Sequence, residues 1–292
     1  MTQTDPAVAP VEVPDDAPVR ADQLKAGRSR VRVIAGSIIP PVLFGLFLLG
    51  LWYFISYIIL DSTRRFLLRP PHQVVKVGFL DWGNFSEILD KTWITTQVAI
   101  KGLGIAILIG FTLAMIMSQS KYIERAIFPY AVTLQAIPIL AIVPLIGFWF
   151  GFGDTSRLTV CVIIALFPII VNTLFGLQSA ERGLHDLFTL HHAHRWTRLR
   201  KLMFPAALPA IFAGLRISAG LSVIGAIVGD FFFAQGQTGL GQLLRRYVLR
   251  LQGEELLAAI IMSSALGVTV FLVFGVIQER AIGKWYDARG TN

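Results

Sequence analysis

Charged residues and cysteines are scarce in this chain of 292 residues. Only 15% of the residues are charged, against about 25% in an average soluble domain. Cys161 is the only cysteine, which excludes an intrachain disulfide and a metal cluster built on cysteines. The sequence has no G-x-x-x-x-G-K-[ST] nucleotide-binding loop, and no Ser/His/Asp set or carboxylate pair suited to catalysis. We therefore expect a chain that is not itself an enzyme.

Long apolar runs occupy most of the sequence, which is 54% hydrophobic. Five runs carry no charge and each has at least about 18 residues, the length of a transmembrane candidate; they are Val33–Leu60, Gly102–Ser120, Ala126–Gly153, Leu158–Ala180 and Leu256–Gln278. A sixth, Pro209–Phe233, contains Arg216 and Asp230. Lipid allows only helices or closed barrels, and these runs do not alternate as barrel strands do. We predict an all-α integral membrane protein with about six transmembrane helices.

Residues 1–30 differ from the rest, because they are rich in proline, alanine, valine and acids and show no apolar face. We expect a disordered cytoplasmic tail there, followed by a transmembrane domain over residues 31–292. The tail and the run after it do not form a signal peptide, because that run is too long.

The lysines and arginines predict the orientation of the chain in the membrane. With the N-terminus inside, fifteen lie in inner segments and nine in outer ones. Because inner loops carry the excess of these residues, both termini are expected in the cytoplasm of a bacterial cell, with the chain in its plasma membrane. The net charge of +8 is then explained by the orientation of the chain in the lipid bilayer, and we do not expect binding to nucleic acid.

The largest inner loop, at about residues 181–205, contains a predicted amphipathic helix. Its apolar face holds four residues at positions i, i+3, i+4 and i+7, namely Leu184, Leu187, Phe188 and His191. Such a face can lie on anionic lipid or enter a groove on a soluble partner. Basic residues follow from Arg195 onward, and Pro205 and Pro209 are expected to end the segment.

The same loop resembles the cytoplasmic coupling motif of ABC importer permeases, which is an Glu-Ala-Ala triplet, then a glycine, then a Leu-Pro ending. Asp186-Leu187-Phe188 takes the triplet and His192 the glycine position, and the ending is completed by Leu202 and Phe204-Pro205. The identities differ from the motif at several of these positions, although the spacing fits. A glycine would bend the backbone at little cost. His192 therefore indicates either a helical geometry that tolerates a side chain or a loop matched to an unusual ATPase.

Two further stretches are similar to the branch of this family that imports nitrate, taurine, sulfonates and vitamin precursors. They are "LQAIPILAIVPLIGFWFGFG" and "GAIVGDFFFAQGQTGLGQLL", and the resemblance covers about residues 65–285. It implies a permease subunit of a type I ABC importer, formed by two copies of this chain. It also implies two partners, an ABC ATPase subunit and an extracytoplasmic solute-binding protein. The ATPase subunit would bind the ATP and magnesium, while this chain binds no cofactor.

The resemblance also implies what the chain carries and where. The solute would be small and polar: nitrate, taurine, a sulfonate, bicarbonate, or a pyrimidine or riboflavin-like vitamin precursor. The residues expected to contact the ATPase subunit are Leu184, Asp186, Leu187, Phe188, His191, His192, Arg195 and Pro205.

Three polar residues within the apolar runs are candidates for the translocation path: Gln135, Asn172 and Asp230. For the first two, hydrogen bonding between helices is an equal explanation. Asp230 is an ionisable group at membrane depth, which either meets solute or holds a break in its helix. The loop histidines are expected to be solvated or to face a partner, not to bind metal.

An ion-coupled secondary transporter, acting without an ATPase, is the alternative function. It would need internal repeats and several acids at mid-membrane. The sequence shows no convincing repeat and one such acid.

Overall fold

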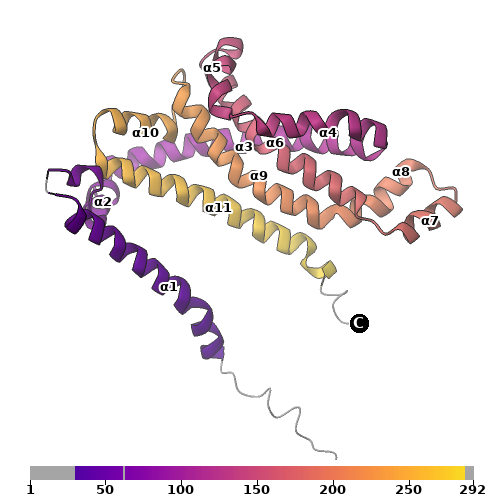
Figure 1. Ribbon diagram of the computed structural model, residues 1–292, viewed down its shortest axis with the longest axis horizontal. Helices are drawn as coiled ribbons and strands as arrows, with labels where there is room; N and C mark the ends of the chain where they lie inside the picture. The colour runs from indigo at the N-terminus through magenta and orange to yellow at the C-terminus, as the bar shows by residue number, and fades with distance from the viewer. Residues whose placement is uncertain (1–29, 62, 287–292) are drawn as a thin grey trace, which may run out of the picture. The chain divides into compact units, whose positions relative to one another are not determined.

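The computed structural model describes residues 30–61 and 63–286, so residues 1–29 of the predicted tail lie outside it. Every regular element in the described ranges is a helix (Figure 1). The chain divides into two compact units at Ile59. The first holds α1 (Arg30–Phe54) and the π-helical turn η1 (Ile55–Ile59), with a candidate span at Ile39–Ile59.

The second unit begins at Leu60 and contains the remaining elements. In chain order they are η2 (Arg65–Leu67), α2 (Pro71–Val75), η3 (Lys76–Leu80), α3 (Trp82–Ser118), α4 (Lys121–Ala136), α5 (Ile139–Phe150), α6 (Asp154–Gln178), α7 (Arg182–Leu190), α8 (Arg195–Arg198), η4 (Leu199–Met203), α9 (Phe204–Phe232), α10 (Leu240–Leu249) and α11 (Gly253–Tyr286). Within this unit α3, α6, α9 and α11 lie side by side, with α7 and α10 at opposite ends (Figure 1).

The helical membrane fold is confirmed: among the described residues, five helices are long and apolar enough to span a bilayer. The run expected to form one span, residues 126–153, is not one continuous helix: α4 and α5 meet there at an angle of 101°. The reason is Pro138, which has no N–H and disfavours helical backbone at the residue before it. Ile137 accordingly has an extended ψ of 127°. Counting the bent pair as one span gives six.

The prolines at the start of α9 do not interrupt their helix. We expected Pro205 and Pro209 to end the loop segment, yet one helix runs from Arg195 to Phe232 through both of them. The helix widens to a π-helical turn, Leu199–Met203, just before Pro205. A wider turn displaces the carbonyls that the proline ring would otherwise meet, so the helix continues.

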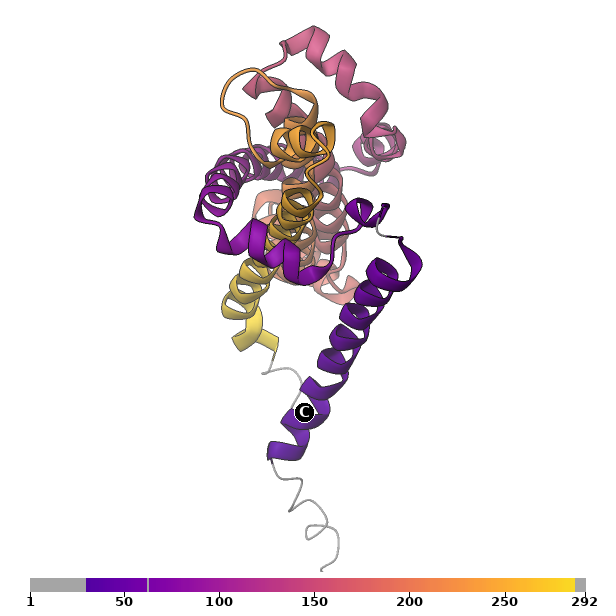
Figure 2. The ribbon, with the colours of Figure 1, turned by 90° about the vertical axis from the view of Figure 1, so that its left-hand side faces the viewer.

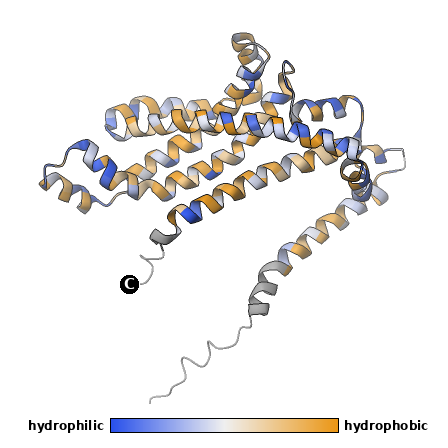
Figure 3. Cartoon of the chain, turned by 180° about the vertical axis from the view of Figure 1, so that it is seen from behind, coloured by the Kyte–Doolittle hydropathy of each residue, from blue (hydrophilic) through white to orange (hydrophobic). Residues whose placement is uncertain are grey.

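The centre of the second unit is α6, in which 61% of the span is buried, against 11% in α11. Apolar residues lie all along the helices of this unit (Figure 3), and many of their side chains are exposed. Leu108 on α3 and Phe148 on α5, for example, are 71% and 77% exposed. Apolar residues on both inner and outer faces are typical of a protein whose solvent is lipid.

Helices α3, α6 and α9 meet at Cys161, which is fully buried. A Cβ added to Gly102 would lie 2.3 Å from its sulfur, and one added to Gly225 would lie 2.7 Å from its Cα. Small residues allow membrane helices to approach this closely, which is how they gain packing energy in lipid. The cysteine is therefore a packing residue between two glycines.

We predict that Gly225→Ala destabilises the protein by about 1–3 kcal/mol, because α6 and α9 must separate to admit the methyl group. Gly220→Ala is the matched control: it lies on the same helix, and a Cβ there has no neighbour within 4 Å. Thermal unfolding of the detergent-solubilised variants measures the difference. Equal melting temperatures for the two variants would contradict the packing role of Gly225.

Candidate functional site

The predicted apolar face lies on α7, at the end of the second unit opposite α10 (Figure 1). None of the nine residues of α7 is buried. Leu184 and Leu187 are 42% and 47% exposed, and Phe188 is half-buried. The structure thus brings these three predicted residues together on one short helix. Leu190, 77% exposed at the end of α7, adds an apolar side chain that we did not include among the contact residues.

The chain reverses directly after α7. His191 caps the helix and His192 has a φ of +49°, the left-handed region that favours glycine. The Ala193 N–H donates to the carbonyl of Phe188 at 2.9 Å, which closes the turn. A helical geometry at His192 is therefore wrong: the residue takes the conformation a glycine would take, at a cost of about 1–2 kcal/mol.

The base of this loop is fixed to the membrane helices. Arg198 Nη2 donates to Thr189 Oγ1 at 2.8 Å, which ties α8 to α7. Behind it, buried side chains from η4 pack against α6 and α9; this cluster contains Leu177, Leu199, Met203, Ala207 and Ile211. The coupling candidates Asp186 and Arg195 are exposed, and half-buried Pro205 lies within the continuous helix. The apolar face of α7 is therefore presented on a rigid support.

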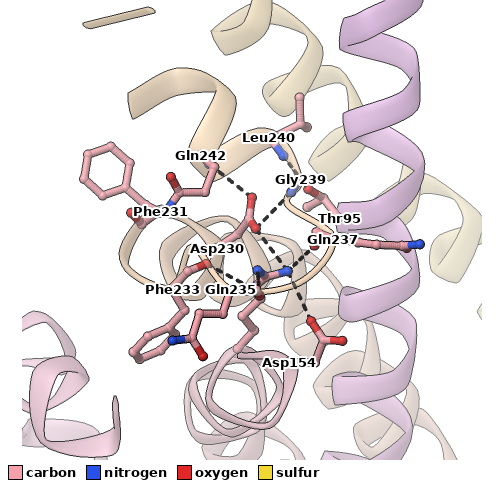
Figure 4. Close-up of polar contacts among 11 residues, drawn as sticks. Thr95, Asp154, Asp230, Phe231, Phe233, Gln235, Gln237, Gly239, Leu240 and Gln242 are labelled. Atoms are coloured by element: carbon pink, nitrogen blue, oxygen red, sulfur yellow. Dashed lines mark hydrogen bonds and ion pairs between the residues drawn. The ribbon is translucent and has the colours of Figure 1, made fainter. Parts of the chain in front are cut away.

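A second polar arrangement lies at the opposite end of α6 and α9 (Figure 4). Its centre is Arg157, whose side chain is fully buried. Arg157 donates to three backbone carbonyls of the segment that follows α9: Phe233 through Nε at 3.2 Å, Gln235 through Nη2 at 2.5 Å, and Gln237 through Nη1. One side chain thus holds a seven-residue connection that has no helix of its own. We call this arrangement, with Asp230, the outer clamp.

Asp230 completes the outer clamp from α9 and is 2% exposed. Its Oδ1 accepts from the Gly239 N–H at 2.9 Å and lies 3.6 Å from Arg157 Nη1, while Oδ2 accepts from the Gln242 N–H at 3.2 Å. Those N–H groups belong to the start of α10, so the carboxylate acts as an N-cap supplied from another helix. Of the two roles considered for Asp230, these contacts favour the structural one.

Figure 2 shows this end of the second unit. Two further contacts hold α10 against α3 there. Arg246 Nη2 lies 2.6 Å from Glu87 Oε1. Burial, and then the charge of Glu87, raises the pKa of Tyr247. The phenol, which is protonated at neutral pH as in any tyrosine, donates to Glu87 Oε2 at 3.4 Å.

The structure does not bring the three predicted path residues together. Asn172 is half-buried between α6 and α9, where its amide donates to the Pro168 carbonyl at 2.8 Å. Gln135 is exposed at the end of α4. Asp230 belongs to the outer clamp, and within the described ranges these three share no hydrogen bond.

Arg157 is the residue that sequence reasoning missed, because we counted it among the charges of an outer loop. Its position in the sequence was a signal of burial. Arg157 directly precedes the charge-free run Leu158–Ala180, and the sixth run contains an acid, Asp230, that could pair with it. For metal binding, no three His, Cys, Asp or Glu residues cluster anywhere in the described part of the chain.

Comparison with known proteins decides the family. Residues 106–284, more than half of the chain, match the family described as "Binding-protein-dependent transport system inner membrane component". This chain belongs to that family. It is therefore the non-catalytic membrane component of an ABC transport system, a multi-pass protein of the inner membrane. Membership confirms the resemblance found in the sequence and argues against an ion-coupled secondary transporter.

Several relatives are similar to this permease over most of its length. The formylaminopyrimidine transport permease protein ThiX of Halalkalibacterium halodurans is 34% identical over 82% of this chain and 94% of its own. The riboflavin transport system permease protein RibX of Chloroflexus aurantiacus is 33% identical over 56% of this chain and 60% of its own. The putative aliphatic sulfonates transport permease protein SsuC of Escherichia coli is 28% identical over 82% and 89%.

A solved structure shares the fold. The crystal structure of an amino acid ABC transporter with histidines aligns with 70% of this permease and 99% of that chain, with a TM-score of 0.53 at 18% identity.

We predict that Asp230→Asn destabilises the permease by about 3–5 kcal/mol, because it leaves the buried Arg157 without its buried counter-charge. Asp154→Asn is the control: Asp154 lies 3.3 Å from the same guanidinium, but its side chain is 70% exposed. Its loss should cost less than about 1 kcal/mol. Thermal unfolding, with limited proteolysis of the segment after α9, measures both. A similar loss in the two variants would contradict the outer clamp.

Proposed function

We propose that this permease imports a small polar solute by coupling to an ATPase subunit through α7. The observation that carries the proposal is the apolar face of Leu184, Leu187 and Phe188, which the chain's own helices leave exposed or half-buried at the tip of α7. An amphipathic helix that presents such a face fits a groove on a partner protein. Asp186, His191, His192 and Arg195 would surround that contact, with Pro205 behind it in the supporting helix.

Docking to a protein is favoured over docking to lipid by the support of α7. The loop is tied back by Arg198 and by the buried cluster under η4, so a push on α7 reaches α6 and α9 directly. A helix that only rests on a membrane needs no such rigid base. ATP and magnesium would be bound by the ATPase, and their cycle would move α7 and so bias two states of the permease.

The orientation and the assembly follow from this role. An ATPase works in the cytoplasm, so α7 lies on the inner side of the membrane. With an even number of spans, both termini lie on that side too. The outer clamp and α10 then face the extracytoplasmic binding protein. A second copy of this chain would complete the path.

For the solute, we propose an uncharged heteroaromatic vitamin precursor, such as a formylaminopyrimidine or a flavin. The support is that ThiX and RibX, at 34% and 33%, exceed SsuC, at 28%, in identity to this permease. The charge-free run 126–153 agrees with an uncharged solute, since an anion would call for a cation in the path.

We predict that Phe188→Asp prevents the ATPase subunit from co-purifying with the permease, or leaves its ATP hydrolysis uncoupled from uptake. Burial of one phenylalanine contributes about 1.5–3 kcal/mol, which corresponds to at least a tenfold weaker complex. Thr189→Asp is the matched control, because it places the same charge on the opposite face of α7, next to Arg198. Pull-down and proteoliposome uptake measure the two.

Coupled transport at the normal rate in Phe188→Asp would exclude α7 as the coupling element. Faster hydrogen exchange of the α7 amides in liposomes, at unchanged ATPase binding, would instead identify α7 as a helix that rests on lipid. The melting temperature of each variant shows whether the membrane fold is intact.

The solute class is tested with the complete transporter in proteoliposomes. We predict that the partner binding protein loaded with a formylaminopyrimidine or with riboflavin stimulates ATP hydrolysis and uptake, whereas an alkanesulfonate does not. The reason is that the apolar runs place no cation near mid-membrane in α4 and α5 to pair with a sulfonate. Stimulation by the sulfonate alone would contradict the proposed class and leave the α7 coupling proposal unaffected.

A further inference from the structure

The break between α4 and α5 leaves backbone polar groups without helical partners. The Ile137 N–H donates to the Thr133 carbonyl at 3.2 Å, but the next residue, Pro138, has no N–H to offer Leu134. The chain then turns by 101°, so the first N–H groups of α5 point away from the last carbonyls of α4. Several carbonyl and N–H groups at the break therefore need partners from elsewhere.

These groups lie at membrane depth, because Gln135 is ten residues, or about 15 Å, along α4 from Arg125, the last charged residue of that helix. The chain's other helices do not cover them. Gln135, Ala136, Ile137 and Pro138 are all exposed, and so is Thr133 one turn earlier. Hydrocarbon offers no hydrogen bonds, so irregular backbone occurs at this depth only where protein covers it or water reaches it. The break cannot face lipid.

Side-chain chemistry distinguishes water from a covering protein. The break carries the primary amide of Gln135 among otherwise apolar residues, and its donors and acceptors are unused within the described part of the chain. The helix after the break, α5, carries no polar side-chain group other than the indole N–H of Trp149. A contact with a second copy would suit that apolar helix, whereas the polar groups concentrated at its start suit water and a solute. Broken helices line solute sites in other membrane transporters for this reason.

We propose that the α4–α5 break, residues 133–138, lines the water-filled solute path and that Gln135 hydrogen-bonds the solute. The inference rests on the proposed function and adds the residues that select the solute. The break offers carbonyl oxygens, N–H groups, a hydroxyl and an amide, and no charged group. The Thr133 hydroxyl already donates to the Pro129 carbonyl at 2.9 Å, so the free donors and acceptors are the backbone groups and the Gln135 amide. They match an uncharged solute with both donors and acceptors, such as an aminopyrimidine.

Cysteine labelling tests the proposal, because Cys161 is fully buried and gives no background. The test positions are Gln135→Cys and Ile137→Cys. Leu145→Cys on α5 and Leu108→Cys on α3 are controls that are also exposed, at 42% and 71%, but lie within regular apolar helix. A charged methanethiosulfonate reagent reacts only with thiols that water reaches. In proteoliposomes with the ATPase, both test positions should react about tenfold faster than both controls.

Two outcomes would overturn the proposal. Labelling at 135 and 137 as slow as at 108 would show that water does not reach the break. Disulfide-linked dimers through these cysteines, with no labelling, would show that a second copy covers it. Binding of the ATPase is measured in the same preparation, so failure of the α7 coupling proposal is recognised separately.

Uptake by Gln135→Ala provides a second readout. Loss of one hydrogen bond should raise the KM for solute by about two- to tenfold, with ATPase binding and melting temperature unchanged. Gln135→Asn retains the amide and should recover part of the effect. An unchanged KM in Gln135→Ala would exclude solute contact by this residue.

Discussion

The close pairing of α6 with α9 is the contact on which the rest of the second unit depends. Glycines on α9 make it possible: a Cβ on Gly214 would lie 2.7 Å from Asn172 Cβ, and one on Gly229 would lie 3.0 Å from Arg157 Cα. Since lipid provides no hydrophobic force between helices, this approach supplies packing energy that bulkier residues would forfeit. The pair runs from the outer clamp to the base of α7. It is therefore the closely packed connection between the two ends that the proposed coupling through α7 requires.

The outer clamp and the α4–α5 break are two polar arrangements within the apolar part of the chain. They differ in how many of their polar groups find a hydrogen-bond partner within the chain. Arg157 has partners for all of its nitrogens, in three carbonyls and two carboxylates. Such a saturated network is rigid, and it holds the connection to α10 in one conformation. The α4–α5 break is the opposite case, with polar groups that the chain leaves open. In lipid an unsatisfied group is expensive, so its persistence indicates that something outside this chain meets it.

Prolines show where prediction from the sequence succeeds and where it stops. The apolar runs were recognised because a bilayer demands about 20 apolar residues for each helix, and the face of α7 because a helix repeats every 3.6 residues. Pro138 and Pro205 both follow residues that lie in a helix, yet one breaks the helix and the other lies within it. The difference at Pro205 is a π-helical turn packed on α6, a tertiary feature that no local rule contains.

The sequence by itself determined the membrane class, the helical spans and the amphipathic segment at α7, because each depends on short-range composition and period. It also carried the family resemblance that the comparison confirmed. Only the tertiary structure decided the role of Arg157. In the sequence it is a loop cation, and its burial depends on carbonyls about eighty residues further along the chain. The same holds for the left-handed turn at His192, where closure onto Phe188 and the tie to α8 outweigh the preference of one residue. Long-range contacts set both, and neither leaves a local pattern to read.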